Sequence, residues 1–211
     1  ELNRRKNDLN PLMDANNIPY SEVQTFYKDA YKILDDVETQ QVVIDTGLRE
    51  LRQGESDAQA KVEQFEFRLR NLKRYVEKQR LPGLPGDYLE SFFMATDRVE
   101  DLSKSLNKIR VNMLEVNQLV KECETDIKGL ETKTNDLVDA AALTEQMMQY
   151  ANRYRFTNDS VKMSIEKALN LFSKDYRYQD ALDEIGTTLE RVEPGAFKRI
   201  ESFYYDNLDQ F

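Results

Sequence analysis

The sequence contains no histidine, no tryptophan and a single cysteine among its 211 residues. Histidine is the base of most nucleophilic triads and a common ligand of zinc and di-iron sites, so centres that depend on it are excluded. One cysteine, Cys123, can form neither a thiolate cluster nor an internal disulfide. No glycine-rich phosphate-binding motif occurs either. We therefore expect a protein that is not an enzyme, with no catalytic residues, no metal site and no cofactor.

Glycine and proline are also scarce, at 7 and 5 residues. With so few turn residues the secondary-structure elements must be long, and only helices reach such lengths. The net charge of −9 gives no general attraction to nucleic acid or to an anionic membrane surface. No apolar run is long enough to cross a membrane. Because the chain starts with Glu1, we expect a piece of a longer protein, in which any membrane anchor lies upstream.

Apolar residues recur at alternating spacings of four and three, the period of a coiled-coil seam. The pattern predicts one helix from residue 21 to about 80 and a second, uninterrupted helix from residue 87 to about 156, each on the order of 90 Å long. The turn between them is short, which makes the helices antiparallel neighbours. The second seam is expected to pass through Leu106, Ile109, Met113 and Val116.

Two helices leave one flank of each seam uncovered, so a third helix is expected along them. Residues 1–20, a missing upstream region or a second chain would supply it. Three shorter helices are predicted at about 159–173, 176–192 and from Pro194 onward. The predicted domains are 1–20, the end of a preceding helix and a turn; 21–156, the long antiparallel hairpin; and 157–211, a short-helix subdomain packed on the base of the hairpin.

Positive charge is concentrated at the end of the first long helix. Two interpretations are open: cations are favoured near a helix C-terminus by the dipole, or they bind an acidic partner. The cluster consists of Arg68, Arg70, Lys73, Arg74, Lys78 and Arg80.

A polar and aromatic stripe, residues 149–155, ends the second long helix. Three of its side chains share one helix face at i, i+3 and i+4, and two tyrosines form an adjacent pair. The hairpin pairing places the stripe opposite residues 13–19. It is interpreted either as a hydrogen-bonding cluster that fixes the short helices or as a patch that binds a partner. The candidate partner-binding residues are Gln149, Tyr150, Asn152, Arg153, Tyr154 and Arg155.

Four separated segments of the chain, in this order, are similar to the EzrA family of septation ring formation regulators from Gram-positive bacteria. The resemblance covers essentially the whole chain and corresponds to the C-terminal region of the family. The segments are Ile18–Ser21, Leu81–Pro85, Gln149–Arg155 (QYANRYR) and Val192–Ala196.

The resemblance implies an elongated, spectrin-like all-α bundle, built here on the long antiparallel hairpin with short C-terminal helices. It also implies an N-terminal membrane anchor absent from this fragment, a location on the cytoplasmic face of the membrane at the division septum, and binding to the tubulin-like protein FtsZ, whose ring assembly the family limits. Other division proteins are further expected partners. The family's QNR patch, linked to mid-cell localisation, corresponds to residues 149–155.

Two other functions are weighed against this one. The chain could be a general scaffold or tether that forms a homo-oligomer through its open helical flank. Residues 160–211 could also form a tetratricopeptide-like peptide-binding module, although only one degenerate hairpin is present and several repeats are normally needed. The residues that suggest such a module are Ala168, Phe172, Tyr176, Tyr178, Ala181 and Leu182.

Overall fold

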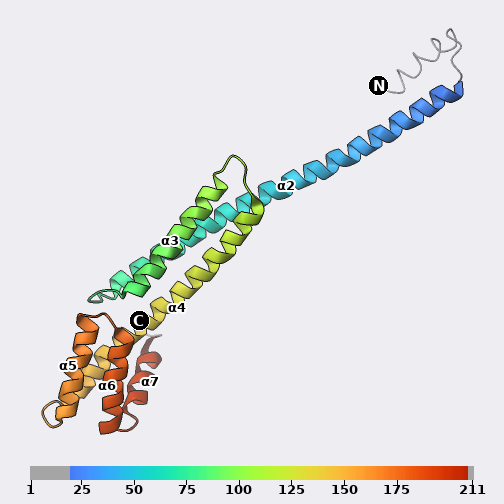
Figure 1. Cartoon of the computed structure of the whole chain (residues 1–211). Helices are drawn as coiled ribbons and strands as arrows, with labels where there is room; N and C mark the ends of the chain where they lie inside the picture. The colour runs from blue at the N-terminus through green and yellow to red at the C-terminus, as the bar shows by residue number, and fades with distance from the viewer. Residues whose placement is uncertain (1–19, 209–211) are drawn as a thin grey trace. The chain divides into compact units, whose positions relative to one another are not determined.

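The computed structural model describes residues 20–208, which form helices joined by turns and contain no strand (Figure 1). The predicted all-α class is therefore confirmed. The predicted segment 1–20 lies outside the described residues, apart from Tyr20. The elements are α2 (Tyr20–Lys78), α3 (Gly86–Leu106), α4 (Met113–Ala151), the 3-10 helix η1 (Asn152–Tyr154), α5 (Asp159–Ser173), α6 (Tyr178–Val192) and α7 (Ala196–Leu208).

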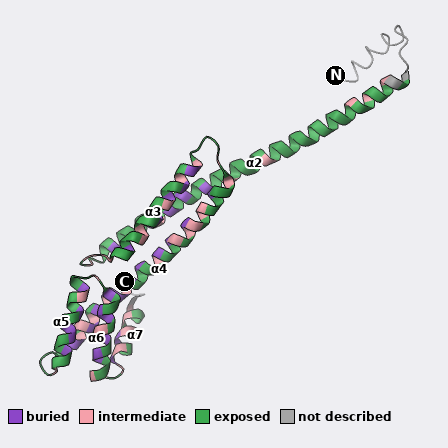
Figure 2. Ribbon diagram, in the orientation of Figure 1, coloured by how far each residue is buried: buried purple, intermediate pink, exposed green. Residues whose placement is uncertain are grey.

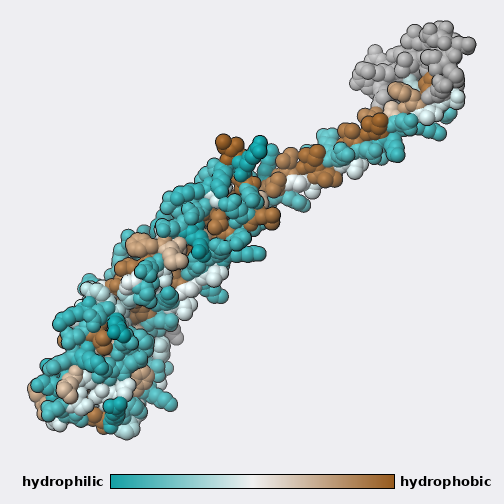
Figure 3. All heavy atoms as spheres, viewed as in Figure 1, coloured by the Kyte–Doolittle hydropathy of each residue, from teal (hydrophilic) through white to brown (hydrophobic). Residues whose placement is uncertain are grey.

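The chain divides into two units, with the boundary between Gly54 and Glu55, inside α2. The described part of the first unit, residues 20–54, is a single helix whose seam residues are mostly exposed (Figure 2). Val37, Ile44 and Leu51 are 55%, 60% and 50% exposed. Apolar atoms accordingly gather on the surface of this stretch of α2 (Figure 3).

The second unit begins with three helices, the last part of α2 together with α3 and α4. Helices α3 and α4 lie side by side and run antiparallel (Figure 1). The Tyr88 and Thr134 hydroxyl oxygens are 3.0 Å apart toward one end of this pair. Toward the other end, the Ser105 hydroxyl lies 3.4 Å from the Glu115 carboxylate. The start of α3 thus contacts the later half of α4, and the end of α3 contacts the start of α4, so the two helices are antiparallel.

Arg68 joins α2 to α4. Its Nε and Nη2 donate to the two carboxylate oxygens of Glu131, each at 2.8 Å, and Nη1 donates to Glu124 at 2.8 Å. These hydrogen bonds raise the pKa of Arg68 and lower the pKa of Glu131. A bidentate pair fixes both the distance and the orientation of two helices. One member of the predicted basic cluster is therefore engaged inside the bundle.

The prediction of one uninterrupted second helix is wrong. Residues 107–112 form a turn that separates α3 from α4, and the chain reverses direction there. Ile109, expected in the seam, is fully exposed. Asn112 caps α4, its side chain accepting from the Leu114 amide at 3.2 Å. The apolar spacing continues through the turn because α3 and α4 both bury their stripes in the same core.

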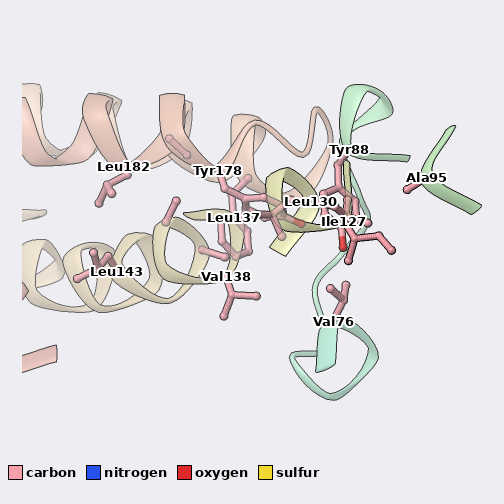
Figure 4. Close-up of a cluster of buried hydrophobic side chains, with 14 of the residues drawn as sticks. Val76, Tyr88, Ala95, Ile127, Leu130, Leu137, Val138, Leu143, Tyr178 and Leu182 are labelled. Carbon is pink, nitrogen blue, oxygen red and sulfur yellow. The ribbon is translucent and has the colours of Figure 1, made fainter. Parts of the chain in front are cut away.

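The core of this unit runs along α4. Its buried side chains meet Val76 of α2 and Tyr88 of α3 in one region and Tyr178 and Leu182 of α6 in another (Figure 4). Cys123 is fully buried, as its seam position predicts, and burial raises the pKa of its thiol to about 11. A buried thiol with a raised pKa is an unreactive packing group at neutral pH.

Helices α5, α6 and α7 pack on the C-terminal half of α4. Asn158 starts α5, because its side-chain oxygen accepts from the Ser160 and Val161 amides at 3.0 and 3.3 Å. The residues that suggested a tetratricopeptide-like module are used largely in this packing. Those that are buried are Ala168, Phe172, Tyr178, Ala181 and Leu182.

The turn between α2 and α3 contacts the turn between α5 and α6. The Tyr178 hydroxyl donates to the Gly83 carbonyl oxygen at 2.7 Å. A Cβ atom on Gly83 would lie 2.4 Å from Cζ of Tyr176, so only glycine permits this approach. The Leu-Pro-Gly-Leu-Pro segment is thus a docking turn between two helical groups.

Candidate functional site

The predicted stripe lies where α4 ends and η1 begins. The structure divides its six residues into two sets. Tyr150 and Tyr154 are half-buried and point toward α6 and α7, while the remaining residues are exposed. The exposed residues are Gln149, Asn152, Arg153 and Arg155. The predicted opposite side, residues 13–19, lies outside the described residues.

The inner set is organised by Glu193, in the turn between α6 and α7. The Tyr150 hydroxyl lies 2.8 and 2.9 Å from the two carboxylate oxygens of Glu193, and the Tyr154 hydroxyl donates to one of them at 2.6 Å. Arg199 of α7 pairs with the same carboxylate. One carboxylate therefore ties the end of α4 to α6 and α7.

Hydrogen bonds from Tyr154 and Tyr150 lower the pKa of Glu193 below its ordinary value of 4.5. The bonds favour the charged form, so the stability they supply is complete above the unfolded-state pKa and is lost as the pH falls through the lower folded-state pKa. The docking of the short helices on α4 is therefore sensitive to acid.

We expect Glu193→Gln to destabilise the protein at neutral pH and to lose this effect in acid. Urea denaturation at several pH values gives the free energy of unfolding of the variant and of the wild type. The difference between these two free energies should be constant above about pH 5 and shrink below about pH 4. Glu166→Gln, at an exposed position without a hydrogen bond or ion pair in the described part of the chain, is the control and should show no such change. A difference that persists unchanged to pH 3 would contradict the role of Glu193.

The outer set is centred on Arg153. Its guanidinium carbon lies 3.3 Å from the centre of the Tyr150 ring, and Nε donates to the Tyr150 carbonyl oxygen at 3.2 Å. Its two terminal nitrogens have no hydrogen-bond partner among residues 20–208. Stacking on an aromatic face restrains the side chain and leaves its outer donors available.

Phe156 was not among the predicted residues, although it follows the stripe directly and is 95% exposed. The sequence signal that could have identified it is a phenylalanine outside the apolar seam that is close in sequence to Arg153 and Arg155. Exposed aromatic and arginine side chains are the residue types enriched at binding hot spots. Glu193 was also missed as a functional group, although its turn belonged to a segment already noted for its resemblance.

The rest of the basic cluster at the end of the first long helix is exposed. Beyond Arg68, its members form no ion pair with any residue that the structure describes. They leave both interpretations of the cluster open. These residues are Arg70, Lys73, Arg74, Lys78 and Arg80.

The described helices include none whose length and apolar content would let it cross a membrane. Between residues 20 and 208, no three acidic or cysteine side chains are grouped closely enough to hold a metal ion. The chemistry that the stripe offers is hydrogen bonding, cation–aromatic contact and apolar contact. These interactions suit the recognition of another protein.

Comparisons with known proteins agree over nearly the full chain. A family model described as "Septation ring formation regulator, EzrA" matches residues 1–204. The septation ring formation regulator EzrA of Enterococcus faecalis is 63% identical over 209 residues, which cover 99% of this chain and 36% of that protein.

More distant relatives carry the same description. That of Lactococcus lactis subsp. cremoris is 44% identical over 92% of this chain and 34% of its own length. That of Streptococcus sanguinis is 37% identical over 88% of this chain and 32% of its own length. The chain spans about a third of the length of these relatives. No solved structure matches it.

Proposed function

Because this chain belongs to the EzrA family of septation ring formation regulators, we propose that it is part of a non-enzymatic division regulator that binds FtsZ and limits Z-ring assembly. The resemblance carried by the four sequence segments is confirmed by the family match. A role in cell division follows from membership of the family. The proposal adds three points: that the partner is FtsZ, that residues 149–155 form the contact, and that the whole protein is tethered to the membrane at the septum.

The observation that carries the proposal is the outward-facing group of Gln149, Asn152, Arg153 and Phe156. Arg153 is held on the Tyr150 ring, so less conformational entropy is lost when its free nitrogens meet an acceptor. Phe156 adds a large apolar side chain with no packing role of its own at 95% exposure. Arginine and aromatic side chains are the residue types enriched in protein interfaces.

The inner set supports the outer set. Tyr150 and Tyr154 are fixed by Glu193, and the Tyr150 ring in turn carries Arg153. The net charge of −9 gives no long-range attraction to an acidic partner, so recognition rests on short-range directional contacts. Bound to FtsZ, the protein would compete with lateral contacts between filaments or with their nucleation, and no catalytic step is needed.

Arg153→Glu tests the proposal. We expect it to weaken binding to purified FtsZ about tenfold or more and to reduce mid-cell recruitment of the full-length protein, because it removes the donors and introduces a repulsive charge. Phe156→Ser should weaken binding about five- to tenfold without changing the charge. Binding is measured by biolayer interferometry, and helicity by circular dichroism.

Lys121→Glu is the matched control. It reverses the same charge at an exposed position in α4, the helix that precedes η1, far along the chain from the stripe, and should leave binding unchanged. Normal recruitment of Arg153→Glu, or an equal loss in Lys121→Glu, would overturn the assignment of the stripe. A loss of helicity would show that Arg153 has a structural role instead.

A general scaffold that dimerises through its helical flank is the second candidate. The exposed apolar seam of residues 20–54 favours it, since such a face is usually covered by another helix. Sedimentation equilibrium on the same preparations separates the two functions. A concentration-dependent dimer, together with FtsZ binding that Arg153→Glu does not alter, would favour the scaffold. The exposed residues of this face include Phe26, Ile33, Val37, Ile44, Leu48 and Leu51.

A further inference from the structure

A groove of about 700 Å³ lies between the start of α3, the middle of α4 and helices α6 and α7, away from the residues of the stripe. Its apolar lining includes Leu137, Leu143 and Leu182, all buried. The rings of Tyr176 and Tyr205 also line it, and Tyr205 is 46% exposed. The groove therefore combines an apolar base with accessible aromatic rings.

The charged side chains of the groove are predominantly acidic, with five carboxylates against two cations. One cation is already neutralised, because Arg177 Nε lies 2.6 Å from the Asp180 carboxylate. The other, Lys133, donates to the Ser91 hydroxyl at 2.8 Å. Across residues 20–208, no cation lies within ion-pair distance of Asp87, Asp136 or Glu201. Three carboxylates are thus available around one apolar groove.

Two tyrosines of α7, Tyr204 and Tyr205, interact with the acidic side chains of this groove. The Tyr204 hydroxyl donates to Asp139 at 2.8 Å. The pKa of the Tyr205 hydroxyl is raised by partial burial and by the charges of Asp139, Glu201 and Asp136. A cation entering the groove would meet both a favourable potential and aromatic faces on which a guanidinium can stack.

The geometry points to a docking groove for an arginine-containing amphipathic peptide segment of a partner protein. Arginine suits the site better than lysine, because its planar group can pair with a carboxylate and stack on a tyrosine at the same time. Apolar side chains of the same segment would pack against the rings of Tyr176, Phe197 and Tyr205, which are not fully buried. This surface is separate from the stripe at residues 149–155 and does not depend on the identity of the partner there.

The test uses fluorescein-labelled synthetic peptides of about twelve residues, alternating arginine with leucine and phenylalanine, and the complete chain. A second peptide carries citrulline, the neutral analogue, in place of each arginine. Fluorescence anisotropy should show saturable binding of the arginine peptide and binding at least tenfold weaker for the citrulline peptide. Failure of the arginine peptide to saturate, or equal affinity of the two peptides, would overturn the inference.

A pair of double variants locates the binding. Asp136→Asn with Glu201→Gln removes two groove carboxylates and should weaken the arginine peptide about five- to tenfold. Glu63→Gln with Glu166→Gln removes the same charge from exposed positions on α2 and α5 and should leave the affinity unchanged. Equal losses in the two variants would mean attraction by the whole acidic surface and would overturn the assignment. Circular dichroism melts verify that both variants are folded.

Discussion

Replacing Phe65 with alanine should lower the free energy of unfolding of the unit formed by residues 55–211 by about 3 to 5 kcal/mol. The side chain is 0% exposed and is one of the largest fully buried groups in the core. Removing its ring takes away apolar area that is hidden from water and leaves a cavity that the surrounding helices fill only in part. Urea denaturation followed by far-ultraviolet circular dichroism measures the loss.

Phe67→Ala is the matched control, two positions further along the same helix. Phe67 is 57% exposed, so its removal should change the free energy of unfolding by no more than about 0.5 kcal/mol. The same amino acid is deleted in both variants, and helix propensity rises in both. Losses of similar size would contradict the orientation of α2 on the bundle, since only one face of the helix is buried there.

Replacing Gly186 with valine should destabilise the same unit by about 1 to 3 kcal/mol. Gly186 is buried in α6, and a Cβ atom at this position would lie 2.7 Å from Cδ2 of the Phe197 ring. That ring belongs to α7, so the added side chain must push α7 away from α6 or turn the ring into solvent. The same urea denaturation measures the effect, and loss of the α6–α7 contact should also raise the exposure of neighbouring amides to hydrogen exchange.

Gly129→Ala supplies the opposite expectation. Gly129 also lies inside a helix, α4, but it is exposed, and apart from its chain neighbours and the nearby backbone of its own helix no atom lies within 4 Å of the position that a Cβ atom would take. Alanine should therefore stabilise the helix by up to about 1 kcal/mol through the intrinsic preference of the two residues. Stabilisation by both substitutions would show that Phe197 does not pack on α6 as described.

The seam of α2 illustrates how far periodicity carries a prediction. Val62, Phe65, Leu69 and Val76 were expected on one face, and all four are buried in the second unit. In the first unit the same spacing continues through exposed residues such as Val37. Periodicity identifies which residues share a face, because that depends on helix geometry alone. Which neighbour covers the face depends on the path of the rest of the chain.

The break after Leu106 shows the corresponding weakness. The spacing from Leu106 to Val116 fits a continuous helix, yet the chain turns there and Ile109 is exposed. The available signals were Asn107 and Asn112, since asparagine competes for backbone hydrogen bonds and favours turns and caps. Without proline or glycine at the turn, those local preferences were outweighed by the apolar pattern.

At the candidate site, helical spacing predicted that Gln149, Asn152 and Arg153 share one face. All three are exposed, although α4 ends at Ala151 and the last two belong to η1. The spacing did not find Glu193, which lies 39 residues from its partner Tyr154. One of the two interpretations of the stripe, a hydrogen-bonding cluster that fixes the short helices, agrees with the bonds that Tyr150 and Tyr154 make to Glu193. Such contacts depend on how α6 and α7 pack against α4, and that packing cannot be predicted from local sequence spacing.

The amino-acid sequence by itself therefore determined the all-α class, the residues that share a face of each helix, and the family. These properties follow from local spacing, composition and short motifs. The tertiary structure alone decided that the chain reverses at residues 107–112 and that Gly83 and Gly186 lie against aromatic rings. It also decided that one groove is bordered by three carboxylates that have no ion pair within residues 20–208. The physical reason is that these features join residues distant in sequence, and their contacts exist only once the helices have packed.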